Sequence, residues 1–381
     1  MDLRLSEEQE ILRKSARDFL TQRCPLDALP ETEFDAAAFD AGLWKEMASL
    51  AWLGLALPEG MGGSGGSDVE LELLCEELGR SLCPAPFLPI AVAARTALEH
   101  AGSSRARELI SALAAGTSRP VLAVPDGAGR WGPEDTGVRL EGSSVTGRKG
   151  FVEAGTLADG LLVTATGPDG ACTLVLVDPR APGTTVSPLT MMSGAQFAEV
   201  TFDRVHAEPL DAGWDAIDAA VVRTSVMHAA WCAGAAARLL EDTVVYVSGR
   251  HQFGVPLGSF QAVQHRLADC DIATAEAATL ARQAGELLAQ DSSAARRMSS
   301  TAFVRATDAF VTVARSCHQV WGGIGFCTEA HVHLFSRRAK VAQHSWGGTA
   351  HHLDVVADEV RRLPLLRDRY EDALMRRGIA L

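Results

Sequence analysis

The spacing of the apolar residues changes twice along this chain, and that change limits the folds open to it. From Ser6 to about Gly116 the apolar residues recur at helical spacing. From Pro120 to about Leu210 they form short runs broken by Gly, Pro and Asp, which is typical of strands. From Asp215 onward the helical spacing returns. The pattern predicts a β region between two helical regions.

The first helical region is punctuated by clear start and stop signals. Ser6 is followed by acidic residues and Gln9, the pattern of a helix N-cap. The glycine-rich segment 54–66 contains Pro58 and is expected to be an ordered loop rather than helix. The predicted helices are one that begins after Ser6 and three others at 36–50, 69–82 and 90–113.

The last region carries two long apolar stripes and no strand signals. One stripe follows 3-4 spacing and consists of Phe303, Ala306, Phe310, Val313, Cys317 and Val320. Long amphipathic helices without strands predict a bundle that packs closely, often against other subunits. The expected fold is mostly α with an inserted β domain. It has an N-terminal helical domain at 1–118, a small β-barrel-like domain at 119–211 and a helical bundle at 212–381.

Composition narrows the class of partner. The chain has 381 residues, of which 47% are hydrophobic and 22% charged, an ordinary balance for a globular protein. Its net charge of −13 disfavours nucleic acid and anionic membrane surfaces. The acidic start does not resemble a signal peptide, and no long apolar run occurs, so a cytoplasmic protein is expected. The eight cysteines are widely spaced and are expected to be reduced and mostly buried.

Arg250 lies where a predicted long helix ends. A Gly/Pro-rich turn follows it, and another helix opens near Phe260. An arginine beside the backbone N–H groups of a helix start suits a diphosphate. The alternative is an arginine paired with a surface carboxylate.

Gly322 and Gly323 follow a predicted helix and leave one stretch of backbone bare. The pair is either a simple helix stop or a surface that a flat or charged ligand approaches. It is not a dinucleotide fingerprint, because that motif follows a strand and opens a helix.

The late histidines invite a metal interpretation, which their spacing does not support. No His-Glu-x-x-His or cysteine-rich pattern occurs, so we expect no metal site. The histidines concerned are His318, His331, His333, His344, His351 and His352.

Three segments in this order resemble the acyl-CoA dehydrogenase family over nearly the whole chain. They are Leu43-Trp44 through Gly54 to Gly65, Arg250 to Gly254 with Phe260-Gln261, and Gln319 to Phe326 with Thr328-Glu329. The resemblance implies that FAD removes two hydrogens from Cα and Cβ of an acyl-CoA thioester and that an electron-transfer flavoprotein takes the electrons. It also implies a helical domain, a β domain and a four-helix bundle, assembled as dimers of dimers with FAD across a subunit interface.

The resemblance assigns cofactor contacts residue by residue. It implies that one subunit offers Arg250, Gln261, Gln319, Gly322 and Gly323 to the diphosphate and adenine half of its neighbour's FAD. It implies further cofactor contacts at Gln252, Phe253, Phe260, Thr349 and His351.

The flavin-ring half departs from the family pattern. Ala123, in segment 123–129, and Glu153, in segment 151–153, stand where hydroxyl groups are expected. An added carboxylate disfavours reduction of a ring that becomes anionic. We therefore expect a weakened flavin pocket in this chain.

The catalytic base of the family is missing. Gly347 occupies the usual glutamate position, and Thr224 occupies the alternative one. Gly347 keeps a backbone N–H that can polarise a thioester carbonyl, but proton abstraction needs a base. For a different chemistry on the same fold, which needs no such glutamate, Glu153 and His344 are the substitute candidates.

Three functions fit this combination. In the first, the chain is the base-lacking partner in a heteromeric acyl-CoA dehydrogenase, as in some enzymes that act on steroid side-chain thioesters. Alternatively it is a flavin-dependent monooxygenase or another enzyme on the same fold, or a flavin-free scaffold subunit. Small residues near 229–237 suggest room for a bulky acyl group.

Overall fold

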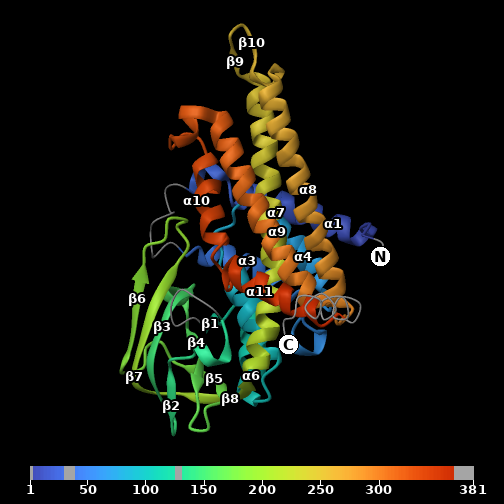
Figure 1. Cartoon of the computed structure of the whole chain (residues 1–381). Helices are drawn as coiled ribbons and strands as arrows, with labels where there is room; N and C mark the ends of the chain where they lie inside the picture. The colour runs from blue at the N-terminus through green and yellow to red at the C-terminus, as the bar shows by residue number, and fades with distance from the viewer. Residues whose placement is uncertain (1–2, 30–38, 125–130, 364–381) are drawn as a thin grey trace, which may run out of the picture.

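The structure is a computed structural model, and it describes residues 3–29, 39–124 and 131–363. Long helices form a bundle, and a β domain packs against one side of it, as Figure 1 shows. The predicted arrangement of helical region, central β domain and C-terminal helical bundle is therefore confirmed. The elements change from helix to strand at Pro120 and from strand to helix at Trp214. The three domain boundaries predicted from the sequence stay predictions.

The N-terminal region is helical. Ser6 and Gln9 form the capping box that starts the first helix, as their spacing predicts. The start of the helix predicted at 36–50 lies outside the described residues. The helices here are α1 (Glu7–Arg23), α3 (Ala41–Ser49), α4 (Asp68–Arg80), the π-helix η4 (Leu88–Ala94), α5 (Arg95–Glu99) and α6 (Ser104–Ala114).

The single helix predicted over 90–113 is wrong, because the segment is interrupted. The N–H of Gly102 donates to the backbone O of Asp211 (3.3 Å) instead of continuing a helix. Ser103 then caps α6 by accepting from the N–H of Ala106 (3.1 Å). Apolar periodicity persists across the break, so the pattern alone does not reveal it.

The glycine-rich segment 54–66 is ordered, as expected, but it is not free of helical turns. Two 3₁₀ turns, Trp52–Gly54 and Glu59–Met61, flank its proline. A Cβ at Gly63 would lie 2.1 Å from the backbone O of Leu57, so only glycine permits this close approach.

The β domain is one eight-stranded sheet with the path β6-β7-β3-β2-β4-β5-β8, in which β1 pairs with β4. β1, β4, β5 and β7 lie at the predicted apolar runs, and the other four strands were not predicted. The strands are β1 (Pro120–Ala123), β2 (Arg139–Glu141), β3 (Ser144–Glu153), β4 (Gly160–Thr166), β5 (Cys172–Val177), β6 (Thr184–Leu189), β7 (Phe197–His206) and β8 (Glu208–Gly213).

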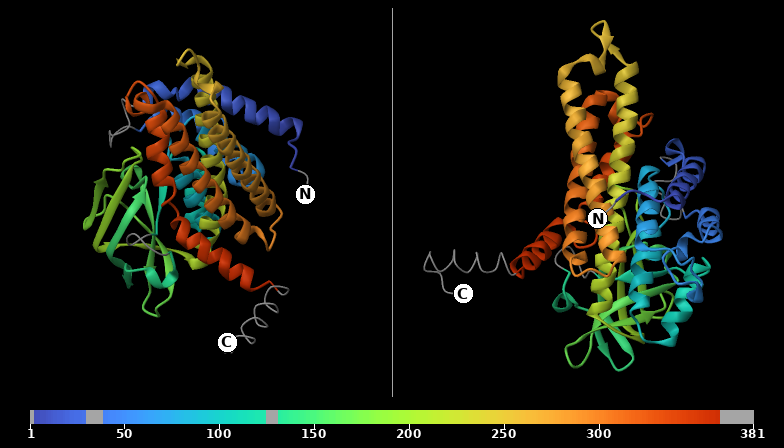
Figure 2. Two further views of the ribbon diagram at one scale, coloured as in Figure 1. Left: turned by 45° about the horizontal axis from the view of Figure 1, so that its top comes forward. Right: turned by 90° about the vertical axis from the view of Figure 1, so that its right-hand side faces the viewer.

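The C-terminal region is a helical bundle, as predicted. A two-stranded hairpin joins the first two helices and projects beyond their ends, as the right-hand view of Figure 2 shows. The elements are α7 (Trp214–Gly249), β9 (His251–Gln252), β10 (Val255–Pro256), α8 (Gln261–Ala289), α9 (Ala295–Trp321), the 3₁₀ turn η8 (Gly322–Phe326), α10 (Val332–Ala342) and α11 (Gly348–Arg361).

Small residues let α4 and α7 pack with their backbones almost touching. A Cβ at Gly79 would lie 1.9 Å from the backbone O of Trp231, and one at Gly234 would lie 2.0 Å from that of Glu76. The alanines between 229 and 236 are buried in the same core. The expectation that these residues leave room for a bulky acyl group is therefore wrong, because they serve helix packing.

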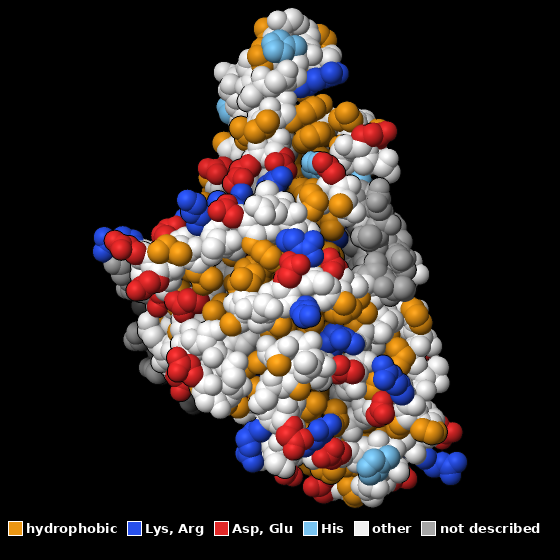
Figure 3. Space-filling model, turned by 180° about the vertical axis from the view of Figure 1, so that it is seen from behind, with side chains coloured by type: hydrophobic (Ala, Val, Ile, Leu, Met, Phe, Trp, Pro, Cys, Tyr) orange, Lys and Arg blue, Asp and Glu red, His pale blue; other side chains and the backbone are white. Residues whose placement is uncertain are grey.

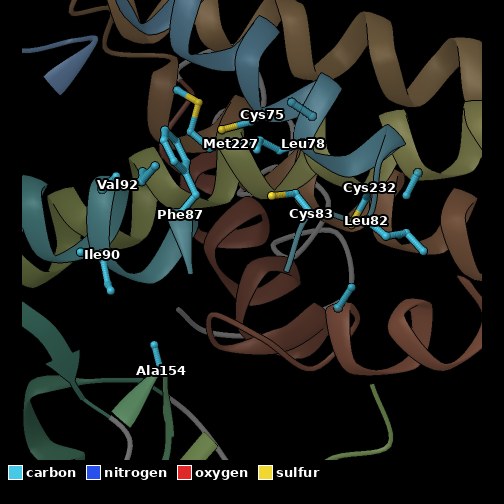
Figure 4. Packing of buried hydrophobic residues seen from close by; sticks show 14 of the residues in the cluster. Cys75, Leu78, Leu82, Cys83, Phe87, Ile90, Val92, Ala154, Met227 and Cys232 are labelled. Carbon is cyan, nitrogen blue, oxygen red and sulfur yellow. The ribbon is translucent and has the colours of Figure 1, made fainter. Parts of the chain in front are cut away.

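Cysteine placement agrees with the sequence prediction. All eight cysteines are free thiols, and six of them are buried. Figure 4 shows Cys75, Cys83 and Cys232 among the apolar residues packed around α4 and α7. Within the described ranges, no helix is both long and apolar enough to cross a membrane.

Candidate functional site

Two cavities meet where the β domain faces the bundle. The first, which we call the proline-loop cavity, has a volume of about 160 Å³. Figure 4 shows Cys83 and Phe87 of its loop and Ala154 of its β-domain wall. Its other wall residues include Pro84, Pro86, Leu157, His228 and Trp231. This cavity is mostly apolar and of the size that admits one ring or a short branched chain.

The second, which we call the tryptophan cavity, has a volume of about 890 Å³. Trp131 and Trp346 pack edge to face on its wall, with ring centroids 6.0 Å apart. Further wall residues are Phe151, Met191, Met192, Phe197, His344 and His351. The cavity therefore offers aromatic faces to a flat ligand.

A strained turn at the end of β3 lies between the two cavities. Phe151 and Ala154 both have left-handed backbone, with φ of 52° and 58°. The pairing of β3 with β7 shifts register between Lys149 and Val152. Bulges of this kind re-aim side chains beside functional sites, and here the turn brings Glu153 to the walls of both cavities.

Glu153 is a partly exposed carboxyl with no hydrogen-bond or ion-pair partner among the described residues. Burial raises the pKa of its carboxyl to about 7. Near neutral pH a large fraction of this group is uncharged and can donate a hydrogen bond. The added carboxyl expected at this position is therefore charged only in part near neutral pH.

Gly347 lies in a turn that holds no side chain able to take a proton. Trp346, Gly347 and Gly348 have positive φ angles of 51°, 90° and 69°. A Cβ at Gly347 would lie 2.8 Å from Cδ2 of His351. The side chain of Thr224, at the alternative base position, is buried and lies on neither cavity wall. Neither position supplies a base.

Buried histidines fix the geometry around this turn. Nε2 of His352 lies 3.0 Å from the backbone O of Trp346, and its Nδ1 lies 3.0 Å from the Ser300 hydroxyl. The Phe303 ring stands between His352 and His228, with centroid distances of 4.0 and 5.2 Å. Burial lowers the pKa of His352 to about 3 and that of His228 to about 4, so both are neutral.

Arg250 lies at the far end of the bundle, where α7 meets the hairpin (Figure 1). It is exposed and forms no ion pair or side-chain hydrogen bond with a described residue. The alternative of an arginine neutralised by a surface carboxylate is therefore not seen in this part of the chain.

The Gly-Gly segment lies at the same end of the bundle. Tyr246, one turn before Arg250, stacks on Trp321 with ring centroids 4.0 Å apart. A Cβ at Gly322 or Gly323 would meet nothing within 4 Å, so packing inside the chain does not require glycine at either position. The positive φ of Gly322 favours glycine, but Gly323 has no such constraint.

Apolar side chains surround these polar features and face solvent. Phe253 is 92% exposed, Val245 74% and Phe326 78%. Figure 3 shows hydrophobic side chains gathered on the surface just below the hairpin. Exposed apolar surfaces of this kind are common at interfaces with other proteins.

The structure separates the predicted site residues into two groups. Thr349 and His351 line the tryptophan cavity together with Gly347. The other eight, at the far end of the bundle, are Arg250, Gln252, Phe253, Phe260, Gln261, Gln319, Gly322 and Gly323. The fold of a single chain therefore does not bring the cavity residues and the bundle-end residues together.

The structure describes only the start of the predicted departure at 123–129. Ala123 is buried in β1, opposite Val163, and lies on neither cavity wall. The following residues, 125–130, lie outside the described residues. Glu153 and His344, the substitute candidates, both line the tryptophan cavity.

The proline-loop cavity was not predicted from the sequence. Pro84, Pro86 and Pro89 are the signal that could have located it, because closely spaced prolines make a rigid extended segment. No comparable sequence signal predicts that Trp131 lines the tryptophan cavity, since one tryptophan in a loop has no characteristic pattern.

The residues present fit FAD at two separate places. At the bundle end, an unpaired guanidinium and bare glycine backbone suit a diphosphate. In the tryptophan cavity, the Thr349 hydroxyl and Trp346 Nε1 are buried without hydrogen-bond partners among the described residues. Such atoms suit a flat ring with polar edges.

Two family models match this chain. The family model described as acyl-CoA dehydrogenase, N-terminal domain, matches residues 6–117. The one described as acyl-CoA dehydrogenase, C-terminal domain, matches residues 211–360. Together the two cover most of the chain, and members of this family bind FAD.

Individual relatives are similar over nearly their whole length. Acyl-CoA dehydrogenase FadE27 of Mycobacterium tuberculosis is 30% identical over 86% of this chain and 90% of its own. A variant of the Tcur3481-Tcur3483 steroid ACAD is 32% identical, with a TM-score of 0.82 over 92% of this chain and 97% of that one. The ChsE4-ChsE5 complex from Mycobacterium tuberculosis is 26% identical, with a TM-score of 0.85 over 96% and 100%. The chain belongs to the acyl-CoA dehydrogenase family.

Proposed function

We propose that this chain is the base-lacking partner in a heteromeric FAD-dependent acyl-CoA dehydrogenase. Its bundle end completes the FAD site of a homologous chain that carries the catalytic glutamate. The exposed and unpaired Arg250 is the observation that carries the proposal.

The missing base supports the partner role. Removing an α-proton from a thioester needs a group of suitable pKa within hydrogen-bond reach. Gly347 has no side chain, and Thr224 is a hydroxyl buried away from both cavities. Without a base, dehydrogenation in this chain's own site is slower by about 10²- to 10⁴-fold.

The bundle end supports a contribution to a neighbour. Its cation and bare backbone face outward among exposed apolar side chains, of which Phe253 is 92% exposed. A second chain that covers this surface buries the apolar groups and brings its own cofactor to Arg250. We assign Gln252, Phe260, Gln261 and Gln319 to the same contact surface.

Two of the similar structures carry paired names. The Tcur3481-Tcur3483 steroid ACAD and the ChsE4-ChsE5 complex are each named for two components. By analogy, this chain pairs with a homologous subunit, and steroid or other lipid breakdown is its metabolic setting.

When bound in the assembled enzyme, FAD would supply the oxidation, a two-electron transfer from the acyl-CoA. Arg250 neutralises its diphosphate, and Gly322 and Gly323 let the backbone approach it. An electron-transfer flavoprotein then takes the electrons, and the enzyme works in the cytoplasm.

A monooxygenase or other flavin chemistry on this fold is the second candidate. It needs no glutamate at position 347, and Glu153 and His344 on the tryptophan cavity offer other titratable groups. A flavin-free scaffold is the third candidate, and the unpaired Arg250 disfavours it because a scaffold has no use for a free cation there.

The test is expression with and without a homologous chain that carries glutamate at the position of Gly347. Alone, the chain is expected to purify with little FAD or to be insoluble. Together, the two chains are expected to form a complex with one FAD per heterodimer. A yellow homo-oligomer with one FAD per chain and acyl-CoA dehydrogenase activity would overturn the proposal.

A further inference from the structure

The wall of the proline-loop cavity contains several polar side chains, and most are already occupied. The Ser193 hydroxyl accepts from the N–H of Ala195, and the Ser345 hydroxyl donates to the backbone O of Val341. Gln196 accepts from the Thr156 hydroxyl, and Arg338 has a partner as well.

His228 has a partner at only one of its two ring nitrogens. Its Nε2 lies 3.1 Å from the backbone O of Ala342, to which it donates. Because the ring is neutral, Nδ1 carries the lone pair, and this atom is buried without a hydrogen-bond partner among the described residues. The His228 ring can therefore accept a hydrogen bond from a ligand but has no second N–H to donate.

Within the described part of the chain, Glu153 is the one carboxyl on the walls of the two cavities, and unlike Nδ1 of His228 it can donate a hydrogen bond when it is protonated. Its carboxyl has no partner among the described residues, and it lies on both cavity walls. A ligand whose apolar tail fills the proline-loop cavity has its first polar atoms at the junction with the tryptophan cavity. For an acyl thioester, that polar atom is the carbonyl oxygen.

We propose that this chain binds a short-chain acyl thioester in its own two cavities, and that the neutral Glu153 carboxyl donates a hydrogen bond to the thioester carbonyl. The ionised carboxylate has no proton to donate and repels the carbonyl dipole, so binding takes up a proton. The volume of about 160 Å³ limits the acyl group to a short chain or single ring. The inference rests on the family assignment of the proposed function, but not on the partner role.

The environment of Glu153 agrees with a titration near neutral pH. Burial raises the pKa of the carboxyl to about 7, and no neighbouring charge shifts it. The other titratable groups on the same walls are Cys83, His228, Arg338, Lys340, His344 and His351. His228 is neutral, and none of the others forms a salt bridge with the Glu153 carboxyl.

The test measures the dissociation constant of butyryl-CoA for the full-length chain between pH 6 and pH 8.5. Binding to the native chain is expected to weaken by about 30-fold over this range, or about tenfold per pH unit above 7. Glu153→Gln keeps the hydrogen-bond donor but cannot ionise. Its affinity is expected to match that of the native chain at pH 6 within about threefold, without the added slope.

Two further measurements keep the result unambiguous. Titration calorimetry in two buffers of different ionisation enthalpy is expected to show proton uptake near pH 7.5 in the native chain and none in the variant. Ionisation of the CoA phosphate is common to both proteins and cancels in the comparison. If the chain alone is insoluble, the substitution is made in this chain only within the mixed complex, where the partner's contribution also cancels.

Equal pH slopes in the native chain and Glu153→Gln overturn the inference, as does an absence of butyryl-CoA binding at pH 6. A 16-carbon acyl-CoA that binds more tightly than butyryl-CoA contradicts the size limit. None of these results bears on Arg250, so the partner role stands or fails separately by the FAD content of the mixed complex.

Discussion

Tyr246 and Trp321 stack with ring centroids 4.0 Å apart and an interplanar angle of 9°, which brings two distant sequence signals to one end of the bundle. Tyr246 precedes Arg250 by one turn of α7, and Trp321 directly precedes Gly322. The Trp321 indole also donates to the Thr243 hydroxyl (3.0 Å). The cation and the bare backbone are thus held together by packing within this chain, before any partner or cofactor arrives.

Loss of this stack is expected to move Arg250 away from the backbone of Gly322 and Gly323. Tyr246→Leu removes an aromatic contact worth about 1 kcal/mol and loosens the end of α9. We expect a lower free energy of unfolding and weaker FAD retention in the mixed complex, measured by denaturation and by flavin absorbance. Tyr246→Phe keeps the ring and serves as the control. Unchanged FAD retention in Tyr246→Leu would show that the stack does not position the site.

Two glycines offer a matched comparison between packing and ligand contact. At Gly79 a Cβ would meet a backbone oxygen at 1.9 Å, whereas at Gly323 it would meet nothing within 4 Å. We expect Gly79→Ala to lower the free energy of unfolding by about 3 kcal/mol.

Gly323→Ala is expected to change the free energy of unfolding by less than about 0.5 kcal/mol. It should nevertheless weaken FAD binding in the mixed complex by about tenfold, because the added methyl group keeps the backbone from the diphosphate. Flavin titration measures this effect. A Gly323→Ala complex that binds FAD normally would make Gly323 a helix stop and nothing more.

Restoring the family's glutamate is not expected to restore catalysis. Gly347 has φ of +90°, and a Cβ there would lie 2.8 Å from the His351 ring. Left-handed backbone of this kind costs a non-glycine residue about 1–3 kcal/mol, so the new carboxylate is displaced from any productive position. Gly347→Ala imposes the same strain without the charge and is the control.

The assay for Gly347→Glu is reduction of an artificial electron acceptor by the single chain with added FAD. The panel contains straight-chain, branched and steroid CoA thioesters. Clear acyl-CoA-dependent activity in Gly347→Glu, absent from Gly347→Ala, would show that this chain's own flavin pocket works and that the turn tolerates the side chain.

The buried histidines predict a loss of stability in acid. The pKa of His352 is lowered to about 3 in the folded chain, while the unfolded chain binds a proton near pH 6.5. The unfolded state therefore gains protons first, and stability falls as the pH drops below 6.5. At pH 5 the loss from His352 amounts to about 2 kcal/mol.

His352→Gln keeps polar atoms for Trp346 and Ser300 but cannot take up a proton in this range. Between pH 7 and pH 5, its free energy of unfolding is expected to fall by about 2 kcal/mol less than that of the native chain. The raised pKa of Glu153 acts in the opposite direction, since stability from that group falls as the pH rises above 4.5, but it is common to both proteins. Equal losses in the two proteins would contradict the prediction.

The sequence predicted those helices and strands in which the buried residues recur with the period of the element. The helices of the bundle and the four apolar strands follow this rule. β3 does not, because its centre contains Lys149, which is fully buried in the core of the β domain. The ammonium group donates to the backbone O of Val124 (3.0 Å) and the Thr164 hydroxyl (2.8 Å), partners that no local pattern reveals.

The candidate site was only partly predictable for a similar reason. The sequence singled out Arg250 and the Gly-Gly segment because a cation or bare backbone at a helix end suits an anionic ligand. It did not locate the two cavities, because these are formed by a loop, a strand end and two helices that meet only in the folded chain. The raised pKa of the Glu153 carboxyl also depends on its burial where these elements meet.

The most direct test of the partner role is Arg250→Ala in this chain, combined with a native partner that carries the glutamate. Arg238→Ala, on the same helix but paired with Asp242, is the matched control. At limiting FAD, the Arg250→Ala complex is expected to bind FAD about 10- to 100-fold more weakly than the native complex, and the control is expected to be unchanged. Full flavin occupancy in the Arg250→Ala complex would contradict the central claim, since Arg250 would then not contact the partner's cofactor.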